Sequence, residues 1–137
     1  MRSLIVDDDA VSRRILEEIL APYGSYDQVE SGKDALAAFA AAHEAHAPYD
    51  LICLDIQMPD MDGQETLSAV RAVEARLGIP VTHGVKVIMT TVKMDQASIF
   101  TAFRQCEAYL IKPVDAESLL LNLEQFGLVP WTNRKTR

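Results

Sequence analysis

Two kinds of apolar pattern alternate along the chain. Short runs rich in branched aliphatic residues are followed by segments in which apolar residues recur every three or four positions. The first pattern is typical of buried strands and the second of amphipathic helices, so we expect repeated strand–helix units around a mostly parallel sheet. The run at residues 26–29 is the most polar and is expected at a sheet edge. The predicted strands are residues 4–6, 26–29, 51–54, 85–89 and 109–111.

Residues that favour helix ends mark the predicted helices. Asp9 can cap the first helix, and residues 31–34 resemble a capping-box start for the second. The fifth helix is expected to begin at Asp115. Pro22 and Gly24 are expected to end the first helix. The third and fourth helices are expected at about residues 63–77 and 95–105.

Composition narrows the class of protein. The chain has 137 residues, of which 49% are hydrophobic and 24% are charged, which is typical of one globular domain with its own core. A net charge of −7 disfavours direct nucleic-acid binding. No apolar run is long enough for a signal core or membrane span, and Cys53 and Cys106 lack metal-site spacing, so we expect a cytoplasmic protein with reduced cysteines and no membrane insertion.

Polar residues able to do chemistry follow four of the five predicted strands. Asp7 and Asp8 follow the first strand and Asp55 the third, while Thr90 and Lys112 follow the fourth and fifth. Taken separately, the acids could be helix caps, Thr90 could simply favour the end of a strand, and Lys112 could be solvated. Because ligands bind at the carboxyl ends of parallel strands, their joint placement predicts one shared site.

The residue types in this predicted site suit phosphoryl transfer. Three crowded carboxylates repel one another unless a cation joins them, and oxygen ligands suit Mg²⁺, with Mn²⁺ as a substitute. A lysine can balance phosphoryl charge, and a hydroxyl can bind a phosphoryl oxygen. The set therefore predicts phosphoryl transfer to a carboxylate.

Four segments, taken together and in order, resemble the receiver domain of two-component response regulators. They are LIVDDD at 4–9, LDIQMPDMDG at 54–63, MTT at 89–91 and YLIKP at 109–113. The resemblance spans about residues 1–126 and leaves 127–137 as a short C-terminal tail. It implies an α/β, three-layer, doubly wound (βα)5 flavodoxin-like fold with a five-stranded parallel sheet in the order 2-1-3-4-5.

The resemblance also implies roles for individual residues. Asp55 is expected to be the phosphoacceptor, and Asp8 and Asp55 are expected to bind Mg²⁺ directly. Asp7 is expected to support the ion largely through water, and the backbone carbonyl of Gln57 to supply a further ligand. Lys112 is expected to pair with the phosphoryl group and to precede a cis peptide bond to Pro113.

The remaining implied roles concern signalling. Thr90 is expected to move toward the phosphoryl oxygen while Tyr109 changes rotamer, and these two residues form the switch. The donor is expected to be a sensor histidine kinase or a histidine phosphotransfer protein. The surface made by the fourth helix, the fifth strand and the fifth helix is expected to bind a downstream target protein or a second copy of the chain. Such a domain catalyses its own phosphorylation and dephosphorylation without being a conventional metabolic enzyme.

The sequence also departs from the family pattern. Thr91 follows Thr90 where a smaller residue is common, and Gln105 and Cys106 replace a common Gly-Ala pair. The interval between Asp55 and Thr90 is long, which predicts an extended loop at about residues 78–86.

Three alternative functions share parts of this pattern. A flavodoxin-like cofactor binder would need a phosphate loop where this chain has Asp7 and two further aspartates, which repel phosphate without a metal. A haloacid-dehalogenase-type phosphatase would have a second acid where this chain has Gln57. A receiver-shaped interaction module that works without phosphorylation is the stronger alternative, but the presence of every chemical group argues against it.

Overall fold

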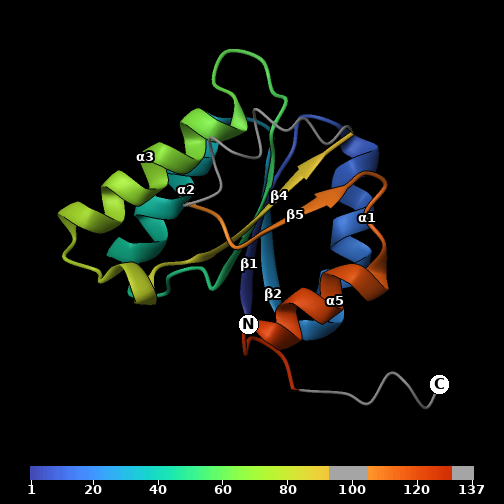
Figure 1. Ribbon diagram of the computed structural model, residues 1–137. Helices are drawn as coiled ribbons and strands as arrows, with labels where there is room; N and C mark the ends of the chain where they lie inside the picture. Colours follow the sequence, from blue (N-terminus) through green and yellow to red (C-terminus); the bar gives the residue numbers. More distant parts are fainter. Residues whose placement is uncertain (93–104, 131–137) are drawn as a thin grey trace.

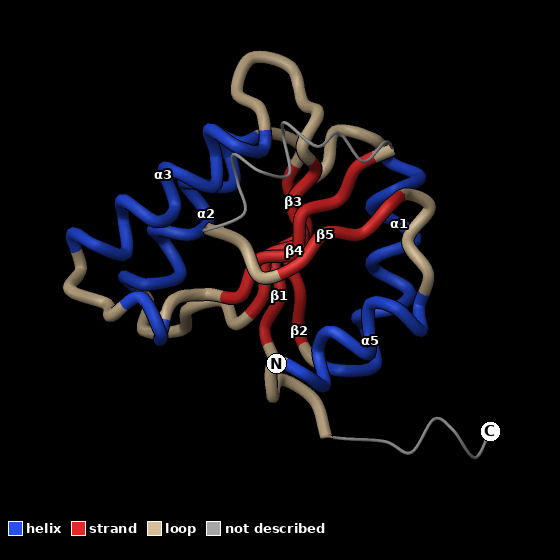
Figure 2. The backbone as a smooth tube through the Cα atoms, in the orientation of Figure 1, coloured by secondary structure: helices blue, strands red, loops and turns tan. Residues whose placement is uncertain are grey.

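The computed structural model describes residues 1–92 and 105–130, and the predicted fourth helix lies outside these residues except for Gln105. In the described part, five parallel strands form one sheet in the order β2-β1-β3-β4-β5 (Figures 1 and 2). This order confirms the prediction, and β2 lies at an edge as its polar sequence indicated. The strands are β1 Arg2–Val6, β2 Ser25–Val29, β3 Leu51–Asp55, β4 Lys86–Thr91 and β5 Ala108–Ile111.

The helices cover both faces of the sheet. Helices α2 and α3 lie on one side, and α1 and α5 lie on the other (Figure 1). No helix among the described residues has both the length and the apolar character that a membrane span requires. The helices are α1 Ala10–Leu20, α2 Gly32–Glu44, α3 Gly63–Arg76 and α5 Ala116–Gln125, with short 3-10 helices at Ala21–Tyr23 and Val81–His83.

Two apolar clusters form the core, one on each face of the sheet. In β1, Leu4 and Val6 pack toward α2 and α3, whereas Ile5 packs toward α1 and α5. Because both faces are covered, the central strands carry apolar residues at successive positions rather than at alternate ones. β3 shows this most clearly, since all five of its residues are buried.

The predicted helix starts are confirmed by side-chain caps. Asp9, Ser31 and Asp115 each accept a hydrogen bond from the backbone N–H three residues later. Asp62 and Glu65 form a reciprocal capping box at the start of α3. Each cap pairs an N–H that the first helical turn leaves without a helical partner.

The predicted long loop connects α3 to β4. It contains the 3-10 helix Val81–His83, and the Val81 side chain is 98% exposed. The loop lies at the amino end of β4 and so at the end of the sheet away from Thr90. The extra residues of this interval are therefore placed far from the strand ends that carry the polar groups.

The chain does not leave the domain at the end of α5. Leu128 and Val129 are partly buried against the cluster between the sheet, α1 and α5, and the Leu128 N–H donates to the Leu123 carbonyl at 2.9 Å. The first residues of the predicted tail thus contribute to the core.

Candidate functional site

The carboxyl ends of the strands bring the predicted site residues together. Asp55 and Thr90 are direct neighbours in the β3–β4 register. Asp7 and Asp8 follow β1, which pairs with the side of β3 opposite to β4. Lys112 follows β5, which pairs with β4. The sheet order, not proximity in sequence, creates this group.

Lys112 links two of the carboxylates. Its Nζ atom lies 2.7 Å from Asp7 Oδ2 and 3.3 Å from Asp55 Oδ1. The Lys112 side chain is only 12% exposed and Asp7 is fully buried, so the pair has little screening by water. The peptide bond between Lys112 and Pro113 is cis, as predicted.

Carboxylate oxygens of Asp7, Asp8 and Asp55 all lie within 4.8 Å of one another. Asp7 and Asp55 are buried and Asp8 is exposed, so the group opens to solvent on the Asp8 side. Three oxygen donors at this separation, with one side open for water, fit the coordination that Mg²⁺ prefers. The residues therefore fit the metal that the sequence predicted.

The charges of the site shift its pKa values. Burial, followed by the nearby Asp7 carboxylate, raises the pKa of Asp55 from 3.8 to about 6, although Lys112 and the Gln57 N–H oppose the change. Burial alone would lower the pKa of Lys112, but its hydrogen bond to Asp7 and the Asp55 charge outweigh burial and raise it. The raised pKa keeps Lys112 positively charged at neutral pH, whereas a pKa of about 6 lets metal-free Asp55 take up a proton in weak acid.

The loop after Asp55 is fixed by a glycine. The Gly63 N–H donates to the Ile56 carbonyl at 2.8 Å, and a Cβ at Gly63 would collide with the backbone carbonyl of Asp55. The start of α3 can therefore approach the end of β3 only with glycine at this position. Gln57 is exposed and its N–H donates to Asp55 Oδ1 at 3.3 Å, while the ligand role of its carbonyl stays a prediction.

Thr90 carries a hydroxyl that is buried without a partner. Within the described part of the chain, Thr90 Oγ1 makes no hydrogen bond, although the residue is only 1% exposed. A buried hydroxyl without a partner is costly. A group that can accept or donate near Thr90 would remove that cost.

Tyr109 contacts a residue whose role the sequence did not indicate. Its side chain is half-buried against the cluster beneath α2 and α3 and hydrogen-bonds the thiol of Cys106. Burial, with a smaller effect of Cys106, raises the pKa of Tyr109. The two residues are three positions apart in the sequence, but only the structure shows the contact.

Arg13 is a second residue that sequence reasoning missed. Its guanidinium donates to the backbone carbonyl of Asp7 at 2.8 Å and lies 3.2 Å from Glu30. The available signal was its position one helical turn after the cap Asp9. A backbone acceptor, however, leaves no mark in the sequence.

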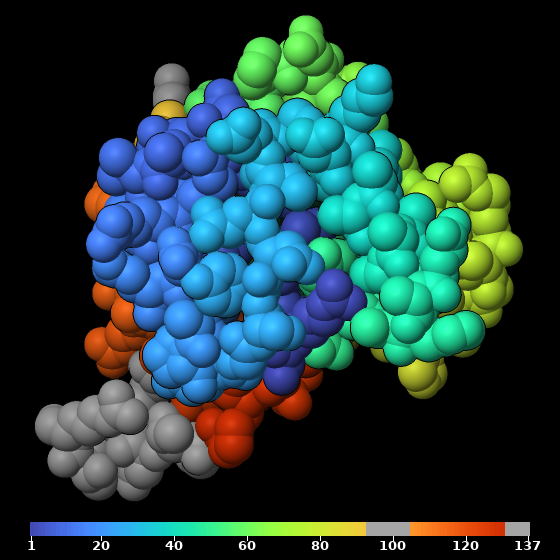
Figure 3. All heavy atoms as spheres, turned by 180° about the vertical axis from the view of Figure 1, so that it is seen from behind, coloured from blue at the N-terminus to red at the C-terminus, as the bar shows by residue number. Residues whose placement is uncertain are grey.

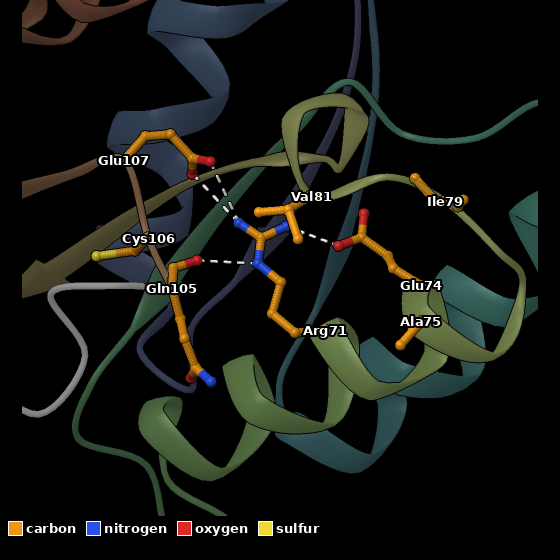
Figure 4. A pocket seen from close by; sticks show the side chains of 8 residues that line it. All are labelled: Arg71, Glu74, Ala75, Ile79, Val81, Gln105, Cys106 and Glu107. Carbon is orange, nitrogen blue, oxygen red and sulfur yellow. Dashed lines mark hydrogen bonds and ion pairs between the residues drawn. The ribbon is translucent and has the colours of Figure 1, made fainter.

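A separate cavity of about 270 Å³ lies between α3, the loop to β4 and the chain leading into β5 (Figure 4). The Arg71 guanidinium dominates its wall. Its Nε donates to the Gln105 carbonyl, and its two other nitrogens contact Glu74, the Val85 carbonyl and Glu107. All five N–H groups of an arginine can be used in such a network, so we assign it a structural role.

The chain is similar in sequence to several known proteins. Residues 3–124 match the family described as the response regulator receiver domain. The chain is 32% identical over 125 residues to hybrid signal transduction histidine kinase L of Dictyostelium discoideum, a match that covers 90% of this chain and 7% of the kinase. It is 30% identical over 129 residues to two-component response regulator ORR41 of Oryza sativa subsp. japonica, covering 93% of this chain and 95% of the rice protein.

A solved structure agrees with these sequence matches. The receiver domain of the histidine kinase CKI1 from Arabidopsis thaliana, complexed with Mg²⁺ and BeF₃⁻, has a TM-score of 0.74 and 27% identity. The match covers 88% of each chain. The chain spans only 7% to 13% of the length of the histidine kinases that it matches.

Proposed function

Because the chain belongs to the response regulator receiver family, we propose that it accepts a phosphoryl group on Asp55 in a two-component signalling pathway. The observation that carries this proposal is the position of Lys112 between two buried carboxylates, 3.3 Å from Asp55 and 2.7 Å from Asp7. A phosphoryl group on Asp55 would find a cation within reach. An exposed acid, Asp8, lies on the open side of the same group.

A divalent cation is part of the proposal. Asp8 and Asp55 would hold Mg²⁺ directly, Asp7 would support it largely through water, and the Gln57 carbonyl would complete the protein ligands. Bound Mg²⁺ would screen the negative charges of the carboxylates and the incoming phosphoryl group. We expect Mn²⁺ to substitute, because it also accepts oxygen ligands.

The chain's own residues would carry out the transfer. An ionised Asp55 oxygen attacks phosphorus, the bond from phosphorus to the imidazole nitrogen of the donor phosphohistidine breaks, and that nitrogen keeps the electron pair. The Lys112 ammonium pairs with a phosphoryl oxygen, and Thr90 supplies the hydroxyl donor that has no other partner in the described part of the chain. When the signal ends, water attacks phosphorus and releases phosphate, which restores the Asp55 carboxylate.

Output would follow from the same contacts. A charge-assisted hydrogen bond from Thr90 to the phosphoryl group favours a state in which Thr90 has moved inward and Tyr109 has changed rotamer. The shift is limited by the difference in contact energy between the two states, typically a few kcal/mol. The binding partner that responds to this change would be a target protein or a second copy of the chain, bound over β5, α5 and the predicted fourth helix.

The donor would be a sensor histidine kinase or a histidine phosphotransfer protein. Support comes from the relatives, which include a hybrid histidine kinase and a two-component response regulator. A cytoplasmic location would suit such a donor and would keep Cys53 and Cys106 as the free thiols that the structure contains.

Chemical phosphorylation tests the proposal without a cognate kinase. After incubation with acetyl phosphate and Mg²⁺, intact mass spectrometry should show one labile phosphoryl group on the wild type and none on Asp55→Asn. Asp60→Asn is the matched control, because Asp60 is an exposed acid in the adjacent loop. Equal labelling of Asp55→Asn and the wild type would contradict the assignment.

A further inference from the structure

Two consecutive arginines in α1 differ sharply in their surroundings. The Arg14 side chain is 77% exposed and pairs with Glu18, which is itself 67% exposed. The Arg13 side chain is only 15% exposed and reaches back toward the end of β1. The Arg13 side chain is thus enclosed at the end of the sheet that carries the acidic group formed by Asp7, Asp8 and Asp55.

Arg13 bridges the ends of two strands. Its Nη1 atom donates to the Asp7 carbonyl at 2.8 Å, and its Nη2 atom lies 3.2 Å from Glu30 Oε1. Glu30 directly follows the edge strand β2, which Figure 3 shows at the surface between α1 and α2. The Glu30 side chain is 72% exposed, so the ion pair with Arg13 does not require burial of the Glu30 carboxylate.

The Asp7 carbonyl matters because it belongs to the peptide unit that begins Asp8. This unit is planar, so fixing the direction of the carbonyl also fixes the N and Cα atoms of Asp8. The rest of Asp7 is held as well, since its Oδ1 accepts from the Asp9 N–H at 2.9 Å and its Oδ2 contacts Lys112. Asp8 itself is exposed, and its direction depends on this backbone.

We propose that Arg13 is a positioning residue for the cation site, which it serves by holding the Asp7–Asp8 peptide so that the Asp8 carboxylate faces Asp55. This inference rests on the proposed function, because it assumes that these carboxylates bind a divalent cation. In this scheme Arg13 contacts neither the carboxylate oxygens of the cation site nor the phosphoryl group. Its effect is on the geometry of a ligand.

A guanidinium suits this position better than an ammonium. Arginine presents several N–H groups in a fixed plane, so it can reach a carbonyl and a carboxylate on different sides at once. Lysine keeps the charge but concentrates its donors on one nitrogen. The substitution Arg13→Lys should therefore keep the electrostatic effect and lose part of the positioning effect.

Isothermal titration with Mg²⁺ measures the proposed role directly. Arg13→Gln should weaken Mg²⁺ binding about 10-fold, the lower end of the usual effect when a group that orients a metal ligand is removed. Arg14→Gln, which removes the same charge one residue later, should leave the Kd unchanged. Arg13→Lys should fall between Arg13→Gln and the wild type, and circular dichroism would verify that every variant is folded.

The partner of Arg13 provides a second pair of variants. Glu30→Gln removes the anchor without touching the arginine and should weaken Mg²⁺ binding by a smaller factor. Glu18→Gln is its control, because Glu18 makes the equivalent exposed pair with Arg14. In Arg13→Gln, the amide resonance of Asp8 should also move, whereas Arg14→Gln should leave it in place.

The rate of phosphorylation distinguishes an effect of Arg13 on Mg²⁺ binding from a direct effect on phosphoryl transfer. With acetyl phosphate, Arg13→Gln should be labelled slowly at low Mg²⁺ and at the wild-type rate once Mg²⁺ is saturating. Equal Mg²⁺ affinities for Arg13→Gln and Arg14→Gln, wild-type affinity in Arg13→Lys, or slow labelling at saturating Mg²⁺ would each overturn the inference. Failure of the wild type itself to bind Mg²⁺ would instead overturn the proposed function.

Discussion

Lys112 lies closer to Asp7 than to Asp55, with Nζ–O distances of 2.7 and 3.3 Å. In the unmodified protein the Lys112 ammonium therefore pairs chiefly with Asp7, the acid that is not expected to be phosphorylated. A phosphoryl group on Asp55 would bring additional acceptor oxygens to the same ammonium. If Asp55 is phosphorylated as proposed, the Lys112 ammonium would shift from Asp7 toward the phosphoryl oxygens.

Replacing Lys112 should destabilise the metal-free protein. Lys112→Met leaves the buried carboxylates of Asp7 and Asp55 without their cation, and removal of one partner from such a buried group costs about 3–5 kcal/mol of unfolding free energy. The loss should be smaller at pH 5, where Asp55 can take up a proton. Urea denaturation at pH 5 and 7.5 measures both values. The exposed Lys33→Met is the control, and equal stability of the two variants would refute the prediction.

The raised pKa of Asp55 predicts a pH dependence of stability. The carboxyl has a pKa of about 6 in the folded, metal-free protein against an ordinary value of 3.8, so the folded state binds more protons between these values. The unfolding free energy should consequently fall as the pH rises from about 4 to about 6. Asp55→Asn removes this contribution and should exceed the wild type in stability above pH 6, by at most about 3 kcal/mol.

Denaturation in the presence of a chelator, repeated from pH 4 to pH 8, gives the comparison. The difference between Asp55→Asn and the wild type should shrink toward zero near pH 4, where both side chains are neutral. Parallel pH profiles for the two proteins would show that Asp55 does not titrate in this range.

Mg²⁺ should stabilise the folded state, because the unfolded chain lacks the clustered carboxylates. At a free concentration 100 times its Kd, the ion should add about 2.7 kcal/mol to the unfolding free energy. Asp8→Ala should lose most of the resulting rise in melting temperature, while Asp60→Asn should retain it. A full thermal shift in Asp8→Ala would exclude Asp8 as a principal ligand.

Thr90 and Thr66 allow a matched test of the unpaired hydroxyl. Thr66 is also buried, but its Oγ1 donates to the Asp62 carbonyl at 2.9 Å. Thr90→Val should stabilise the unmodified protein by about 1 kcal/mol, because it removes a buried polar group that has no partner in the described part of the chain, whereas Thr66→Val should destabilise it by a similar amount. Chemical denaturation of both variants measures whether each substitution raises or lowers the unfolding free energy.

The variant Thr90→Val also tests the proposed switch formed by Thr90 and Tyr109. With Mg²⁺ and BeF₃⁻ as a phosphoryl mimic, amide exchange of the wild type should change from about residue 90 to residue 120 as well as around the acidic group. Thr90→Val should confine the change to the acidic group, and Thr90→Ser should restore the wider response. A wide response in Thr90→Val would argue that the hydroxyl does not carry the signal.

The parts of this fold that depend on local sequence could be predicted. Asp9, Ser31 and Asp115 cap helices within three residues of themselves, so a short segment contains all the relevant information. The shared position of Asp55 and Thr90 was also predictable, because parallel strands that run in one direction must end at one edge. These rules are general and require no side-chain geometry.

Contacts between distant side chains and backbone groups were not predictable in this way. Arg71 and Glu107 are 36 positions apart, and nothing in either segment selects the other. The bond from Arg13 to the Asp7 carbonyl uses an acceptor that every residue carries. The thiol contact of Tyr109 likewise depends on how the chain enters β5.

The loop between α3 and β4 offers a practical handle on this molecule. Its side chain Val81 projects into solvent at the amino end of β4, and Asp55 and Thr90 lie at the opposite end of their strands. A change of length there would leave the strand register intact, since loops at a free surface tolerate insertion. The loop is accordingly a suitable position for a fluorescent label or a tether to a surface, because a group attached there lies at the opposite end of the sheet from Asp55 and Thr90.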